Sequence, residues 1–123
     1  MRASGADYLA YALLDAVIDA YFPVLEKYGE RLEALDDQIT TDEGTETLQD
    51  FHQLRGELLF LRRAIWPHRE AMAALSREVS PLITLETRVH LRDCYDHTIQ
   101  LIDFLETNRD LCSDLRDYYL SKV

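Results

Sequence analysis

The sequence has few of the residues that interrupt helices or shape catalytic loops. Its 123 residues include only four glycines and three prolines. It has no glycine-rich phosphate loop, no CxxC or HExxH pair and no glycine-flanked nucleophile. The usual sequence cues of nucleotide binding, zinc sites and activated serines are therefore missing. We expect a helical protein that is not an enzyme.

Basic residues and cysteines are also scarce. Thirteen bases against twenty-three acids give a formal net charge of -10, which disfavours nucleic acid as a partner and favours cations. Cys94 and Cys112 lie on one predicted helix about 27 Å apart, too far for a disulfide within the chain. No signal peptide is present, and no uncharged run approaches the length of about 18 residues that spans a bilayer. We therefore expect the chain by itself to be soluble.

Apolar residues recur at alternating three- and four-residue steps through most of the chain, which is typical of packed amphipathic helices. We predict helices at about residues 8–39, 46–79 and 81–121, with Ser80 as the cap of the third helix and Pro81 in its first turn. Residues 1–6 have no pattern and are interpreted as a linker or cloning remnant. The fold class is all-α: three long antiparallel helices in an elongated bundle, formed by residues 7–123. The predicted seam of the first helix consists of Leu14, Ile18, Tyr21, Leu25, Tyr28, Leu32, Leu35 and Ile39.

An acidic stripe follows the third predicted helix. Asp96, Asp103, Asp110 and Asp117 repeat every seven residues, so they share one face of the helix. Other polar residues fill the same face, which leaves almost nothing on it that could enter a dry core. We expect this face to meet water, cations or both.

The second predicted helix carries a basic face instead. Arg55, Arg62 and Arg69 also repeat every seven residues. They are spread too widely along the helix to form a phosphate pocket, so pairing with acids of neighbouring helices is the favoured interpretation. His68 occupies a seam position, which is more typical of a hydrogen-bonded core residue than of a metal ligand.

Two short groups of residues could hold a cation. Asp93 and His97 lie four residues apart with Asp96 between them, and Asp15 and Asp19 share a face of the first helix. Carboxylates suit magnesium, whereas an imidazole would admit cobalt, nickel or zinc. The alternative remains open that these acids are solvated, or that those on the third helix are placed by its dipole.

Four ordered motifs resemble the cytosolic part of CorA-type magnesium and cobalt channels. They are LDAVIDAYFP at 14–23, LRRAIWPHRE at 61–70, LRDCYDHTIQ at 91–100 and DYYLS at 117–121. The resemblance covers nearly the whole chain. It implies a homopentamer at the cytoplasmic face of the cell membrane, in which the third helix is a stalk that leads into the first membrane span. The family's N-terminal α/β layer and its membrane helices, with the pore, are missing from this sequence.

The resemblance also implies a function and roles for particular residues. Asp93 resembles a stalk acid that binds regulatory Mg²⁺ between subunits, and Asp15 resembles a second acid of that region. His97, Asp96 and Asp19 are weaker candidates for metal binding. Co²⁺ or another divalent cation is the alternative to Mg²⁺ as the bound ion. Asp117, with Asp103 and Asp110 on the same stripe, would line the cation path at the pore mouth. The alternative function is an acidic helical scaffold, or a PhoU-like metal-binding bundle, with no part in transport.

Overall fold

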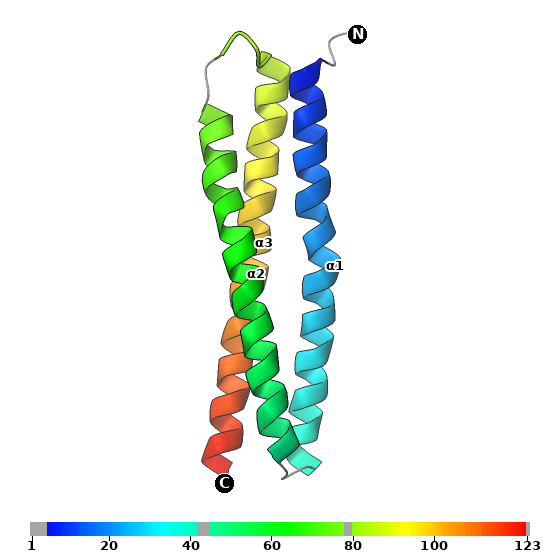
Figure 1. The fold of residues 1–123 in the computed structure, drawn as a ribbon, viewed down its shortest axis with the longest axis vertical. Coiled ribbons are helices and arrows are strands. Elements are labelled where there is room, and N and C mark those ends of the chain that lie inside the picture. Colours follow the sequence, from blue (N-terminus) through cyan, green and yellow to red (C-terminus); the bar gives the residue numbers. More distant parts are fainter. Residues whose placement is uncertain (1–4, 42–44, 78–79, 123) are drawn as a thin grey trace.

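Three long helices lie side by side in an elongated bundle (Figure 1). The computed structural model describes residues 5–41, 45–77 and 80–122. Its helices are α1 (Ala6–Thr41), α2 (Thr45–Arg77) and α3 (Leu85–Lys122). No strand occurs in these described ranges, which confirms the predicted all-α class. Residues 42–44, in the predicted connection between the first two helices, and the predicted end of the second helix at residue 79 fall outside them.

The core lies where α1 and α2 both pack against α3. The contact between α1 and α2 is the smallest of the three helix pairs. Most of the seam predicted from the heptad spacing is buried, and residues such as Leu25, Leu58 and Leu105 have less than 2% of their surface exposed. Leu14, Tyr21 and Tyr28 of the predicted seam are only partly buried and pack against the edge of this core. The acidic stripe faces outward along its whole length, as predicted. The buried apolar residues are Ile18, Leu25, Leu32, Leu35, Ile39, Phe51, Leu54, Leu58, Ile65, Met72, Leu91, Cys94, Leu101, Ile102, Leu105, Cys112 and Tyr119.

A polar side chain interrupts this apolar seam where α3 crosses the middle of α1. Asn108 is only 4% exposed, and its amide donates a 3.1 Å hydrogen bond to the backbone carbonyl of Leu25. A Cβ atom added at Gly29 would lie 4.0 Å from the Asn108 amide oxygen. Because a buried amide is costly unless it is hydrogen-bonded, this contact ties α3 to one register along α1.

The third helix begins at Leu85, so the predicted start at residue 81 with Ser80 as its cap is wrong. The Ser80 carbonyl accepts a hydrogen bond from the Ile83 amide, and the Ser80 hydroxyl accepts one from the Leu82 amide. These bonds close a turn instead of starting a helix. Thr84 is the actual cap, because its hydroxyl accepts a 3.1 Å bond from the Thr87 amide.

A polar cluster provides a link between α1 and α2. Glu57 of α2 accepts hydrogen bonds from the Tyr28 hydroxyl at 2.6 Å and from Arg31 at 2.9 Å. The bond from Arg31, followed by the one from Tyr28, lowers the pKa of the Glu57 carboxyl from 4.5 to about 2. Glu57 is therefore ionised at every pH at which proteins ordinarily fold.

By length and composition alone, α1 also contains a stretch apolar enough to cross a membrane. It lies between Ala6 and Ile39 and has a mean hydropathy of 1.4. Core helices of water-soluble proteins pass the same test. Here Asp15 and Asp19 project from the helix, and a carboxylate at the centre of a bilayer is costly. The stretch is therefore weak evidence for a membrane span.

Candidate metal centre between α1 and α3

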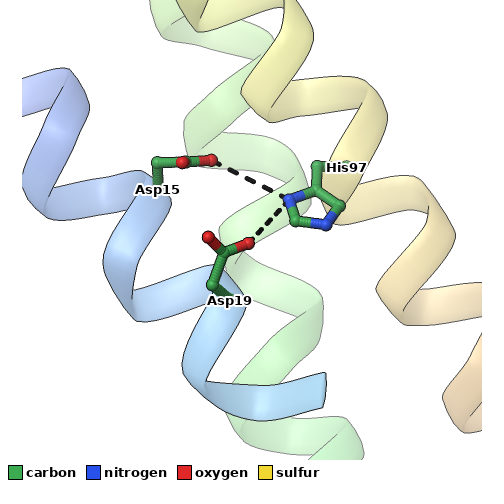
Figure 2. A group of neighbouring side chains, drawn as sticks. All are labelled: Asp15, Asp19 and His97. Atoms are coloured by element: carbon green, nitrogen blue, oxygen red, sulfur yellow. Dashed lines mark ion pairs between the residues drawn. The ribbon is translucent and has the colours of Figure 1, made fainter.

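An acid–histidine cluster, formed by Asp15, Asp19 and His97, bridges the first and third helices. Figure 2 shows both carboxylates of α1 pointing toward one imidazole of α3. The Nδ1 atom of His97 lies 3.0 Å from the Asp19 carboxylate and 3.8 Å from that of Asp15. One ligand atom from each residue lies within 4.8 Å of the others. The four-residue spacing on α1 places the two acids one turn apart, so both reach the same point on α3.

The imidazole is held in place by an aromatic neighbour. Phe22 of α1 stacks on His97 with ring centroids 4.7 Å apart and an angle of 17° between the planes. Phe22 also contacts Phe104, which lies about two turns after His97 on α3, with ring centroids 6.3 Å apart. The ring of His97 is therefore packed against Phe22 while its Nδ1 atom faces the carboxylates.

A buried cysteine lies beneath the cluster. Cys94 is only 1% exposed, and its burial, followed by the effects of the Asp15 and Asp19 carboxylates, raises the pKa of its thiol to about 11. Cys94 does not belong to the cation-sized group of ligand atoms, which Asp15, Asp19 and His97 form. The donor set of the centre is two carboxylates and one imidazole.

This donor set can hold a divalent cation. The carboxylate oxygens suit Mg²⁺, which commonly keeps most of its water and takes one or two protein carboxylates. The imidazole nitrogen suits Co²⁺, Ni²⁺ or Zn²⁺ better. A cation bound through Nδ1 would replace the contact between His97 and Asp19, so metal binding would change how α1 is held to α3.

Comparison with known proteins identifies the family. Residues 2–123 match the model of the CorA-like Mg²⁺ transporter protein family. The chain belongs to this family. It is 47% identical over 123 residues to the cobalt/magnesium transport protein CorA of Thermotoga maritima, and covers 35% of that relative. The CorA of Methanocaldococcus jannaschii is 28% identical over 117 residues, and 37% of it is covered.

Solved CorA structures have the same fold. The complete CorA magnesium transporter of Methanocaldococcus jannaschii superposes with a TM-score of 0.89, over 95% of this chain and 37% of the other. The soluble domain of the same protein gives a TM-score of 0.87 and is covered to 47%. The chain thus spans roughly a third of the length of its full-length relatives and about half of the soluble domain of CorA.

The remaining candidate residues of this CorA-family chain lie outside the acid–histidine cluster. Asp93 and Asp96 are exposed on α3, and neither belongs to a cation-sized group in the part of the chain that the structure describes. Asp15 and Asp93 both act on Tyr11 of α1. Burial, followed by the charge of Asp15 and more weakly that of Asp93, raises the pKa of the Tyr11 hydroxyl. Asp103, Asp110 and Asp117 are exposed on the acidic stripe.

The structure also contains a polar junction that the sequence analysis did not predict. The Glu106 carboxylate of α3 accepts hydrogen bonds from Arg62 at 3.0 Å, from the Trp66 indole at 3.3 Å and from Arg109 at 2.9 Å. Burial raises the pKa of Glu106, but the bonds from Arg62 and Trp66 outweigh it and the pKa is lowered. The expected pairing of the basic face with neighbouring acids is thus present at Arg62. The seven-residue repeat of arginines predicted a basic face on α2, but it did not identify Glu106 as the acid that pairs with it.

Proposed function

We propose that this chain is the cytosolic regulatory and stalk region of a divalent metal ion channel that transports Mg²⁺ and Co²⁺. In the whole protein it lies at the cytoplasmic face of the membrane, in a homopentamer whose stalk helix is α3. The observation that carries the proposal is the family match across residues 2–123. The exposed acidic stripe supports it, since a charged face of this length is suited to a cation path. The match also favours transport over a PhoU-like scaffold.

The regulatory ion is Mg²⁺, held between neighbouring subunits by Asp93 and Asp15. Two features of the chain support this assignment. Asp93 is exposed on α3 and is therefore accessible to a second copy, and Asp15 is half-buried nearby on α1. His97, Asp19 and Asp96 surround the same region, and the imidazole would add affinity for Co²⁺. Asp103, Asp110 and Asp117 continue the acidic face toward the pore mouth.

Charge repulsion supplies the gating energy. Two carboxylates about 8 Å apart on adjacent subunits repel by about 2 kcal/mol at an effective dielectric constant of about 20. Five such pairs around a ring reach the size of a conformational free-energy gap. Mg²⁺ bound between the pairs removes the repulsion and stabilises the closed ring. When internal Mg²⁺ falls, the subunits separate and the open population grows.

Flux through the full-length gene product in liposomes tests this proposal. Asp93→Ala should raise the internal Mg²⁺ concentration that closes the channel by about tenfold, because each 1.4 kcal/mol of lost binding energy is a factor of ten. Asp93→Ala combined with Asp15→Ala should raise it further. Asp36→Ala, a matched exposed acid on α1, should leave closure unchanged. Wild-type Mg²⁺ dependence in the double variant would refute the regulatory assignment.

A further inference from the structure

A basic groove runs between α2 and α3 in this otherwise acidic chain. It consists of two adjoining hollows with volumes of about 580 and 330 Å³ that share His52 and Arg55. No acidic side chain occurs among the described residues that line them. The groove therefore combines an apolar surface with cationic groups, and it fits an acidic, amphipathic partner. The residues of the basic groove used below are Leu48, Arg55, Leu59, Arg109, Arg116 and Leu120.

The sequence of α3 repeats one triplet next to this groove. Arg109, Asp110 and Leu111 are followed seven residues later by Arg116, Asp117 and Tyr118. Each residue along a helix turns the side chain by about 100°. The arginines therefore lie on one flank of α3, the aspartates on its front and the apolar residues on the opposite flank.

The contacts of α3 agree with this assignment of its flanks. Arg109 shares the Glu106 carboxylate with Arg62 of α2, so the arginine flank faces α2. Phe104 lies seven residues before Leu111 and contacts Phe22 of α1, so the apolar flank adjoins α1. The basic groove and the apolar flank thus lie on opposite sides of the helix.

The apolar flank is exposed and carries its own acid. Leu111 is 40% and Tyr118 is 56% exposed, and the exposed Asp114 lies between them. Their spacing of three and four residues gives them a common face. We call Leu111, Asp114 and Tyr118 the acidic strip. It has the amphipathic, acidic character that the basic groove requires.

We propose that the acidic strip of one copy of this chain binds in the basic groove of the next copy. Tyr118 then packs against Leu48 and Leu120, and Leu111 packs against Leu59. Asp114, between them, lies against the arginines. The triplets place strip and groove at the same height on α3, so they meet at the same level when the two copies are parallel. This inference rests on the oligomeric assembly in the proposed function and identifies the surfaces that meet in it.

The geometry of the pair favours a closed ring. Strip and groove are different surfaces, so the contact is heterologous, and such contacts form rings when the rotation between copies closes. Asp110 and Asp117 lie on the front of α3 between the two flanks. Pairing through both flanks therefore turns the aspartate stripe toward the ring axis, where a cation path would run.

Disulfide cross-linking in the intact transporter tests the contact. Leu48→Cys combined with Tyr118→Cys should give an oxidised ladder extending beyond dimers, because each copy carries one partner on each flank. Either single cysteine variant should give dimers at most. The native Cys94 and Cys112 are buried, which keeps the background low. A transporter that is oligomeric by mass but gives no ladder would overturn the inference alone, whereas a monomeric transporter would overturn both it and the proposed assembly.

A charge exchange in the same double-cysteine protein tests the electrostatic pairing. Arg116→Asp should slow cross-linking by at least about tenfold, because it replaces an attractive pair with a repulsive one. Adding Asp114→Arg should restore the rate. Arg77→Asp, a matched exposed arginine at the far end of α2, should have no effect. If Arg116→Asp instead abolished binding to phosphatidylglycerol vesicles and left the ladder unchanged, the groove would belong to an anionic lipid and the proposal would be wrong.

Discussion

The link between α1 and α2 through Glu57 gives a prediction about acid stability. Taken alone, the fall of the Glu57 pKa from 4.5 to about 2 would correspond to about 3.4 kcal/mol, at 1.36 kcal/mol per pKa unit. The side chains of Arg31 and Glu57 are 44% and 33% exposed, so water screens the pair strongly. We therefore expect a contribution of about 1 kcal/mol to the free energy of unfolding at neutral pH.

The sign of the pH dependence follows from the lowered pKa. The carboxyl binds a proton more readily in the unfolded chain, so its contribution is complete above pH 4.5 and is lost as the pH falls through about 2. Urea unfolding of wild type and Glu57→Gln, followed by circular dichroism at pH 7 and pH 2.5, measures the difference. The gap between the two proteins should be about 1 kcal/mol at pH 7 and should shrink at pH 2.5. A gap of equal size at both pH values would show that ion pairing with Arg31 is not its cause.

Two further predictions concern the cap of α3 and the core. Thr84→Ala should destabilise the protein by about 1 kcal/mol through loss of the cap, and Ser80→Ala, in the preceding turn, should cost clearly less in the same urea titration. Leu105→Ala should cost about 2–5 kcal/mol because Leu105 is fully buried. Leu13→Ala, at a position that is 60% exposed, should change stability by less than about 0.5 kcal/mol. Equal costs for the two leucines would contradict the assignment of the core.

The heptad spacing was enough to predict the three helices and their buried faces, because burial follows directly from the period of the apolar residues. The start of α3 was not predictable in the same way. Ser80 before Pro81 has the composition of a helix start, but Thr84 has an equivalent hydroxyl, and local bonds of the turn decide between them. Those bonds depend on backbone geometry rather than on composition.

Contacts between helices at the candidate site could not be predicted from the sequence either. Asp15 and Asp19 were recognisable as a pair, and His97 as a candidate ligand on another helix. Their meeting depends on how far α3 is shifted along α1, and a heptad repeat fits several such shifts equally well. For the same reason the junction of Glu106 with Trp66 was missed. Asp93 and Asp15 were grouped by resemblance, and their joint role remains a proposal about neighbouring subunits.

The buried amide of Asn108 has a mechanical consequence. A purely apolar seam would let α3 slip along α1 by a helical turn and find new leucines to pack against. The hydrogen bond from Asn108 to the Leu25 carbonyl exists in only one register, and slipping would leave a buried amide without a partner, which costs about 1–3 kcal/mol. A displacement of α3 along its axis therefore favours a displacement of α1 in the same direction over slippage between the two helices.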